Sequence, residues 1–238
     1  MKQDTLAQLN AERLARRPVV VVTNIATGEQ RLVKAADVAK DPLHVELDKH
    51  LRMGRSELIQ VDGDSLFLNI YAPTARLIII GAVHISQTLA PLAQSLGYDV
   101  CVVDPRTAFA SPERFPDVRV IADWPETVLP PMNIDRYTAM AAVTHDPKID
   151  DFALLHALER DCFYIGALGS RKTHGRRLDR LKAAGETDNS LSRIRSPIGM
   201  DIGAVSPAEI AVAVMAQITA ALRLPTSSIN TARVSVPA

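Results

Sequence analysis

From residue 77 onward, short apolar segments alternate with longer segments of helical pattern, and this alternation limits the fold more than any other feature of the chain. Apolar runs of this length are typical of buried strands. Strands that alternate with helices form a parallel sheet, because each crossover helix returns the chain to the edge where the next strand begins. Strands are expected at 77–80, 99–103, 118–121, 138–143 and 163–165, and helices at 84–96, 151–159, 173–183 and 207–222.

The first seventy or so residues follow a different pattern, which predicts two hairpins and two helices. Gly28 lies in the turn of the first hairpin, and Asp62-Gly63-Asp64 forms the turn of the second. Helices are expected over about the first 15 residues and near residues 43–53. The predicted fold class is α/β, a Rossmann-like parallel sheet with helices on both faces, preceded by a small α+β N-terminal domain. The expected domains are 1–73, a Rossmann-like ligand-binding domain at 77–224 and a flexible tail at 225–238.

Charge and cysteine content exclude several classes of protein. Lys and Arg total 27, as do Asp and Glu, and a neutral chain has no general field that attracts nucleic acid or an anionic membrane. No apolar run is long enough to span a bilayer and no signal peptide begins the chain, which predicts a cytoplasmic location. Cys101 and Cys162 are too few for a disulfide framework. Buried packing is expected for both, with a redox or sulfur-handling role as the alternative.

The turn after the first parallel strand reads GAVHIS, at residues 81–86. A helix N-terminus at this edge of a sheet can hold a phosphate, so Gly81, Ala82 and His84 are predicted to bind a ligand. The dinucleotide fingerprint Gly-x-Gly-x-x-Gly retains only its first glycine here. Val83 and Ser86 replace the other two glycines, which makes NAD(P) a less favoured ligand.

Asp104 ends the second strand, 23 residues after Gly81. A carboxylate at this place commonly accepts a hydrogen bond from a ribose hydroxyl. Arg106 follows it and could pair with a phosphate or lie over a base. The alternative for both residues is a salt bridge in an exposed loop.

The fourth strand leads into Thr144, His145 and Asp146, three polar residues at the edge where ligands of open α/β sheets gather. They are predicted to bind the ligand, and His145 could move a proton near neutral pH. The alternative is that Asp146 or Asp150 caps the next helix beside an uninvolved histidine. His84 and His145 are too few ligands for a metal site.

The fifth strand leads into a glycine-spaced loop that ends in two cations. Arg171 and Lys172 stand where the helix dipole is already positive, which is unfavourable unless an anion binds there. A phosphate or carboxylate site is therefore predicted at Gly166, Gly169, Ser170, Arg171 and Lys172. Asp201, in a later glycine-spaced loop, is a further candidate whose alternative role is to stabilise a turn. The cations farther along the helix, at positions 176, 177, 180 and 182, are expected to form a solvated face.

Four of these segments, in order, resemble the XdhC/CoxI family of molybdenum hydroxylase accessory proteins. The matching stretches begin LIIIGAVHIS, AVTHDPKIDD, CFYIGALGSRK and PIGMDIGAVS, and they extend over about Leu77 to Leu222. In place of the family's usual first turn, close to Gly-Ala-Gly-His-Val-Gly, this chain has GAVHIS. The family's N-terminal Gly-Gly-Cys-like motif is missing before Leu77, which gives no support to a sulfur relay through that cysteine.

The resemblance implies a chaperone that binds molybdenum cofactor, as molybdopterin or its cytosine dinucleotide form, at the residues named above. It would deliver the cofactor to a xanthine dehydrogenase-like or carbon monoxide dehydrogenase-like apoenzyme, with a cysteine desulfurase as a further partner. A homodimer is expected because the hairpin edges of the small domain need cover. Two alternatives remain open at this point: an NAD(P)-dependent oxidoreductase that uses His145, and a module that senses a nucleotide without chemistry.

Overall fold

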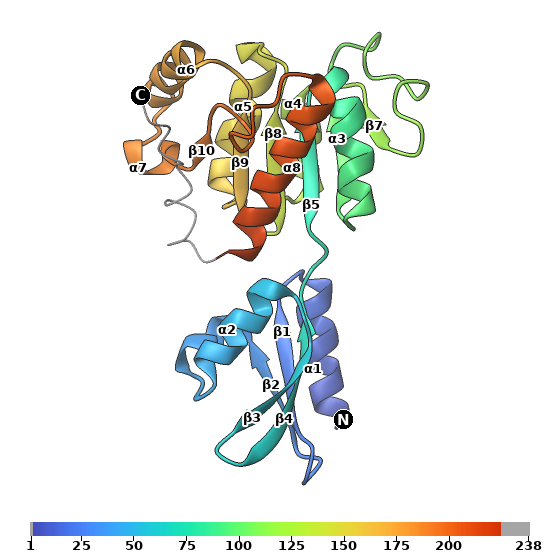
Figure 1. Cartoon of the computed structure of the whole chain (residues 1–238), viewed down its shortest axis with the longest axis vertical. Helices are drawn as coiled ribbons and strands as arrows, with labels where there is room; N and C mark the ends of the chain where they lie inside the picture. Colours follow the sequence, from blue (N-terminus) through green and yellow to red (C-terminus); the bar gives the residue numbers. More distant parts are fainter. Residues whose placement is uncertain (1, 225–238) are drawn as a thin grey trace. The chain divides into compact units, whose positions relative to one another are not determined.

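The computed structural model describes residues 2–224, which fold into two compact units with their boundary between Pro73 and Thr74. The flexible tail expected at 225–238 lies outside the described residues. Most of the helices and strands of both units are labelled in Figure 1. None of the helices within residues 2–224 has the length and apolar character that a bilayer crossing requires.

The first unit is a four-stranded antiparallel sheet in the order β2-β1-β4-β3. The inner strand β1 is buried on both faces, because Val20 and Val22 pack with Leu47 on one side while Val19 and Val21 pack with Leu9 on the other. Both predicted hairpins are present. The elements are α1 (Gln3–Leu14), β1 (Val19–Asn24), β2 (Gln30–Lys34), η1 (Ala35–Lys40), α2 (His44–Met53), β3 (Glu57–Val61) and β4 (Asp64–Tyr71).

The second unit is a six-stranded sheet in which every neighbouring pair is parallel, in the order β10-β9-β8-β5-β6-β7. The α/β class and the parallel sheet predicted from the sequence are confirmed. The strands are β5 (Arg76–Ile80), β6 (Asp99–Val103), β7 (Arg119–Ile121), β8 (Thr138–Ala142), β9 (Tyr164–Ala167) and β10 (Ile194–Arg195).

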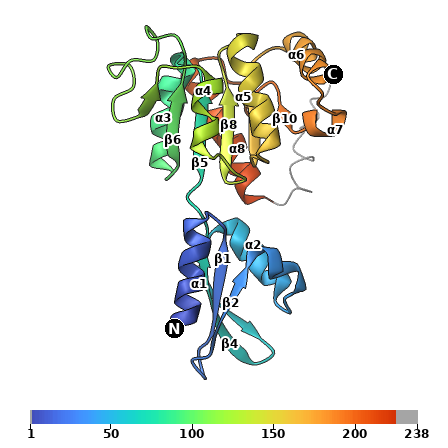
Figure 2. The ribbon, with the colours of Figure 1, turned by 180° about the vertical axis from the view of Figure 1, so that it is seen from behind.

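Helices cover both faces of this sheet (Figures 1 and 2). On one face, Leu77 and Ile79 of β5 pack in a core that includes residues of α3 and α8. On the other, Ile78 and Ile80 pack with residues of α4, α5, α6 and α7. The helices are α3 (His84–Ser95), α4 (Pro125–Val128), η2 (Pro130–Met132), α5 (Pro147–Glu159), α6 (Arg171–Ala183), α7 (Asp188–Leu191) and α8 (Pro207–Arg223).

The elements that the sequence did not predict are short. β10 has two residues, and α4 and α7 have four each, so none of them completes a hydrophobic period that could be read from the sequence. The long helices were found, although α5 begins at Pro147 rather than at residue 151. Proline at the first position of a helix has no N–H to leave unpaired, which makes it a suitable start.

The order of the strands creates a topological switch point between β5 and β8. The chain moves from β5 outward through β6 to β7, then returns to β8 on the other side of β5 and continues to β9 and β10. The carboxyl ends of β5 and β8 therefore lie at the topological switch point, where open α/β sheets bind their ligands. The loops that leave these two strands begin at Gly81 and Val143.

Candidate functional site

The loops after β5 and β8 touch each other at the switch point. Gly81 is buried with a φ of +116°, and its N–H donates to the carbonyl of Val103, 2.8 Å away. A Cβ at this position would lie 2.7 Å from Cγ2 of Thr144. Glycine is therefore needed here for its backbone conformation and for this close approach.

The N-terminus of α3 follows directly. Its N-cap residue, Val83, makes no side-chain hydrogen bond, and the first turn contains no acidic residue. His84 is exposed at the first helical position. Ser86 is buried, and its hydroxyl donates to the carbonyl of Gly81 at 2.5 Å. This hydrogen bond stabilises the turn at a position where the dinucleotide fingerprint has glycine. The first N–H groups of α3 keep the partial positive charge that favours an anion.

Asp104 is fully buried and bonded within the chain. Its two oxygens accept from the N–H of Ala82 at 2.8 Å and from the backbone N, Nε and Nη2 of Arg106 at 2.7 to 2.9 Å. Although burial acts to raise the pKa of Asp104, these donors hold it below its ordinary value. Four donors fill the acceptor positions of a carboxylate. Asp104 thus fixes the β5–α3 turn and has no acceptor position left for a ribose hydroxyl in this structure.

In the loop after β8, the polar side chains of Thr144 and Asp146 are also hydrogen-bonded, within the loop and to the start of α5. The hydroxyl of Thr144 donates to Oδ1 of Asp150 at 2.7 Å and accepts from the N–H of Asp146 at 2.9 Å. Asp146 caps α5 by accepting from the N–H of Lys148 at 3.0 Å. His145 is exposed and has a φ of +66°. Because two carboxylates already occupy the start of α5, this helix end is less suited to an anion than the start of α3.

The loop after β9 leads to a helix end of the opposite character. Ser170 caps α6 by accepting from the N–H of Thr173 at 3.2 Å, and the first turn contains no acidic residue. Arg171 and Lys172 are exposed and make no ion pair or hydrogen bond within residues 2–224. Gly169 has a φ of +143°, and a Cβ there would lie 3.3 Å from Thr173. Two free cations and unopposed helix N–H groups therefore gather at this end of α6.

Two candidates from the sequence have other surroundings. Gly166 lies inside the sheet, where a Cβ would come within 2.7 Å of the Ile198 side chain, so packing accounts for this glycine. Asp201 is exposed in the loop before α8 and has no hydrogen bond or ion pair among the described residues. The structure brings together Gly81, Ala82, Asp104, Arg106 and Thr144 by direct contacts.

The prediction of a solvated cationic face on α6 is wrong at Arg177, which is only 2% exposed. Its Nη2 donates to the carbonyl of Leu168 at 2.9 Å and lies 3.9 Å from Oδ2 of Asp150, which is 1% exposed. Burial raises the pKa of Asp150 to about 6, against the opposing effects of Thr144 and Arg177. A signal was present in the sequence, because Arg177 stands four residues before the buried Leu181 and so shares its apolar helix face.

Both cysteines are buried, as expected. Cys101 is 3% exposed and Cys162 is 1% exposed, and burial raises the pKa of their thiols to about 11 and about 12 respectively. A thiol that resists ionisation is a poor nucleophile. Among residues 2–224, no group of three or more histidine, cysteine or acidic side chains could hold a metal ion.

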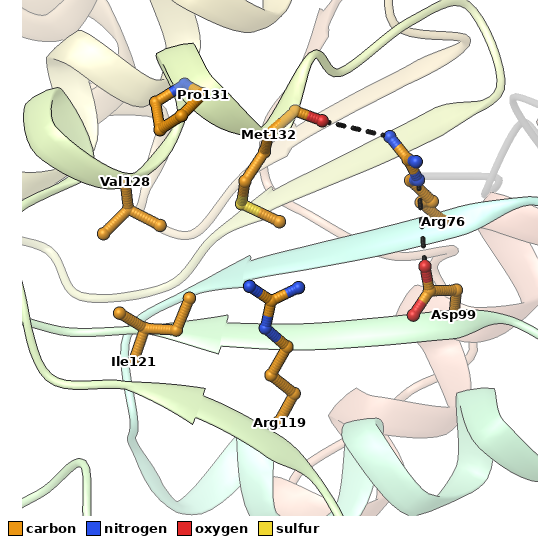
Figure 3. Close-up of a pocket in the computed structure, with 7 residues that line it drawn as sticks. All are labelled: Arg76, Asp99, Arg119, Ile121, Val128, Pro131 and Met132. Carbon is orange, nitrogen blue, oxygen red and sulfur yellow. Dashed lines mark hydrogen bonds and ion pairs between the residues drawn. The ribbon is translucent and has the colours of Figure 1, made fainter. Parts of the chain in front are cut away.

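Two cavities lie away from this edge. One, of about 420 Å³, lies at the amino ends of β5 and β6, where Arg76, Asp99 and Arg119 face Met132 (Figure 3). Arg76 is held there by the carbonyl oxygens of Met132 and Asn133, each at 3.3 Å. The other cavity, of about 550 Å³, is an apolar groove between α3 and α8. Neither contains a residue predicted to bind the ligand.

Comparison with known proteins identifies the second unit. A family model described as the XdhC Rossmann domain matches residues 77–218. The uncharacterized protein YqeB of Escherichia coli K12 is 30% identical over 185 residues, which is 71% of this chain and 32% of that protein. A probable xanthine dehydrogenase subunit of Bacillus subtilis 168 is 32% identical over 155 residues, 65% of this chain and 45% of its own length.

Two further relatives extend the comparison. The molybdenum cofactor insertion chaperone PaoD of E. coli K12 is 32% identical over 154 residues, 65% of this chain and 42% of its own. This chain thus spans less than half the length of each of these curated relatives. A crystal structure described as a xanthine dehydrogenase from Bacillus halodurans superposes with a TM-score of 0.67 at 26% identity, covering 95% of this chain and 70% of that one. The predicted resemblance is confirmed, and the chain belongs to the XdhC family, with its Rossmann domain at residues 77–218.

Proposed function

We propose that this protein binds molybdenum cofactor and assists its insertion into a molybdenum hydroxylase. Two relatives carry names that support a role in this maturation, a molybdenum cofactor insertion chaperone and a probable xanthine dehydrogenase subunit. The observation that carries the proposal is the start of α6, where Arg171 and Lys172 are exposed with no acidic residue in the first turn. This end of the helix opens at the carboxyl edge of the sheet, where the molybdopterin phosphate would find both cations and backbone N–H groups.

The N-terminus of α3, whose first turn contains no acidic residue, is a second position at which an anionic group could bind. A cofactor in the cytosine dinucleotide form carries a further phosphate, which Gly81, Ala82 and His84 could receive at that helix end. Thr144 and His145, which lie on the loop beside Gly81, are proposed to face the pterin. Because the cofactor is a cargo that must leave, it is held by polar contacts at an open edge rather than enclosed.

An NAD(P)-dependent oxidoreductase is the less favoured alternative. Such an enzyme needs an acidic residue free to bind the ribose, whereas all acceptor positions of Asp104 are filled by Ala82 and Arg106. The bound dinucleotide also needs close approach to the first turn, where Val83 adds a side chain. Both observations favour a different anionic ligand at the same edge.

The proposed partners are the apoenzyme of a xanthine dehydrogenase-like or carbon monoxide dehydrogenase-like hydroxylase, a cysteine desulfurase and a second copy of this chain. Cys101 and Cys162 are both buried with raised pKa values. A desulfurase would therefore act on the bound cofactor and not through a thiol of the described chain.

The test is retention of the cofactor by the full chain. Molybdopterin released from a denatured molybdoenzyme is mixed with the purified protein, and the fluorescence of the oxidised pterin is followed through a sizing column. Co-elution at a stoichiometry near one per chain, together with faster reactivation of a cofactor-free xanthine dehydrogenase, is the expected result. Titration with NADH and NADPH is the parallel control. Absence of co-elution with unchanged reactivation would rule the proposal out.

A further inference from the structure

A continuous line of contacts joins the three loops at the carboxyl edge. Gly81, after β5, lies against Thr144, after β8. The Thr144 hydroxyl donates to Asp150 at 2.7 Å, and Oδ2 of Asp150 lies 3.9 Å from Nη2 of Arg177. The same Nη2 donates to the carbonyl of Leu168, after β9, at 2.9 Å. The buried pair Asp150–Arg177 is thus the link in this line that crosses from the β8 loop to the β9 loop.

The pair is incompletely satisfied within the described chain. Oδ2 of Asp150 and both Nε and Nη1 of Arg177 are buried without a hydrogen-bond partner. A buried ion pair adds little stability over well-packed apolar side chains, because the loss of hydration offsets the attraction. Its effect is instead on geometry, since each charge points toward the other and each also holds one loop.

A second ion pair between the same two helices serves as a comparison. Arg180 donates to Asp151 through Nε at 2.6 Å and through Nη2 at 3.0 Å, and this pair lies nearer the surface. Neither member of the outer pair is hydrogen-bonded to residues 144–146 or to Leu168. Two ion pairs therefore join α5 and α6. The outer pair, Asp151–Arg180, lies nearer the surface, and of the two only the inner pair, Asp150–Arg177, contacts the loops after β8 and β9.

We propose that Asp150 and Arg177 are positioning residues, which hold the loops after β8 and β9 at the spacing that binds the anionic group of the ligand. Neither side chain needs to touch the ligand, because both are at most 2% exposed. This inference rests on the proposed function only in the nature of the ligand. The coupling between the two loops can be measured without any ligand.

The experiment compares hydrogen–deuterium exchange in the full chain and two variants. Arg177→Met removes the donor to Leu168 at similar length, and Asp150→Asn keeps an oxygen that can accept from Thr144 but removes the charge. The informative loop is in each case the one that the changed residue does not contact. Arg177→Met should raise exchange at residues 144–146 at least 10-fold, and Asp150→Asn should do the same at residues 168–170.

The double variant Asp151→Asn/Arg180→Met is the matched control, because it removes an ion pair between the same helices. Its exchange in both loops should stay within about twofold of the wild type. In the retention assay, each inner variant should raise the dissociation constant for molybdopterin at least 10-fold, while the control remains within threefold.

Exchange confined to the loop that the altered residue contacts would overturn the inference, because it would show two local roles and no coupling. Unchanged exchange in both loops would overturn it as well. If Arg177→Met does not fold, the effect of Asp150→Asn on residues 168–170 decides the matter. A wild-type chain that retains no molybdopterin, but whose loops show the coupling, would count against the proposed function alone.

Discussion

Gly81 and Thr144 approach each other so closely that a Cβ on residue 81 would lie 2.7 Å from the Thr144 Cγ2. The two residues belong to loops separated by more than sixty positions in the sequence. Strand order makes them neighbours, since β5 and β8 are adjacent while the chain between them forms the other side of the sheet. The contact marks the centre of the proposed ligand site.

Gly81→Ala should therefore damage both stability and binding. The added methyl group meets Thr144, and the φ of +116° is one that alanine rarely adopts. We expect a loss of at least about 2 kcal/mol in the free energy of unfolding, measured by urea denaturation, and weaker retention of molybdopterin.

Gly175→Ala is the matched control for this change. Gly175 lies within α6, and a Cβ there would meet nothing within 4 Å. Alanine should raise the free energy of unfolding by roughly 0.5 to 1 kcal/mol, because glycine is a poor helix residue. A Gly81→Ala variant as stable as the wild type would show that the close approach is not a constraint.

Arg171→Ala/Lys172→Ala should separate binding from stability. Loss of two cations from the anion site should raise the dissociation constant for molybdopterin about 10- to 100-fold. The fold should keep its stability or gain about 0.5 kcal/mol, because positive charge at a helix N-terminus opposes the dipole. Retention and thermal melting are measured in the same preparation.

Arg119→Ala provides the control for this double change, because Arg119 is an exposed cation at the cavity of Figure 3, away from the carboxyl edge. Its removal should leave retention within twofold. Equal losses in both variants would mean that cofactor binding reflects general charge rather than the start of α6.

The pH dependence of stability should carry a contribution from Asp150. Burial raises the pKa of Asp150 from 3.8 to about 6 in the folded chain, so ionisation opposes folding and this group lowers stability as pH rises from 5 to 7. As the pH rises from 5 to 7, the free energy of unfolding of Asp150→Asn should therefore increase by roughly 1 kcal/mol relative to that of the wild type. Urea denaturation of both proteins at pH 5, 6 and 7 measures it.

The comparison must be made between the two proteins, because other groups also make the stability of the fold depend on pH. Burial lowers the pKa values of His156 and His174, which makes the folded state lose stability as pH falls. The charged groups that influence Asp150 most are Arg177 on α6 and Asp151 on its own helix. A constant difference between variant and wild type from pH 5 to 7 would show that Asp150 does not titrate there.

Cys101 and Cys162 should be unreactive in the folded protein. Both are at most 3% exposed, and burial raises their thiol pKa values to about 11 and about 12. A disulfide exchange reagent at pH 8 should label less than about a tenth of the thiols in an hour, and both thiols in 6 M guanidinium. Rapid labelling of either native thiol would reopen the possibility that this chain carries sulfur itself.

Local patterns of the sequence were sufficient for the long elements and for the edge at which they end. The apolar run before Gly81 predicts a strand, and the proline at residue 207 predicts the start of a helix, each from a few neighbouring residues. The charge conflict at Arg171 and Lys172 is equally local, and both side chains are exposed in the structure. Family membership followed from four such segments in order, which the match over residues 77–218 confirmed.

The sequence by itself determined the alternation of strands and helices, the family and the cations at the start of α6, because each depends on residues close together in the chain. Only the tertiary structure decided which charged groups pair with each other inside the fold. Asp104 accepts hydrogen bonds from Arg106, and Arg177 is buried against Asp150. α5 and α6 pack on the same face of the sheet, and this contact between two helices decides that Asp150 and Arg177 are paired. The spacing within α6 places Arg177 on the apolar face of that helix, but it does not specify the partner.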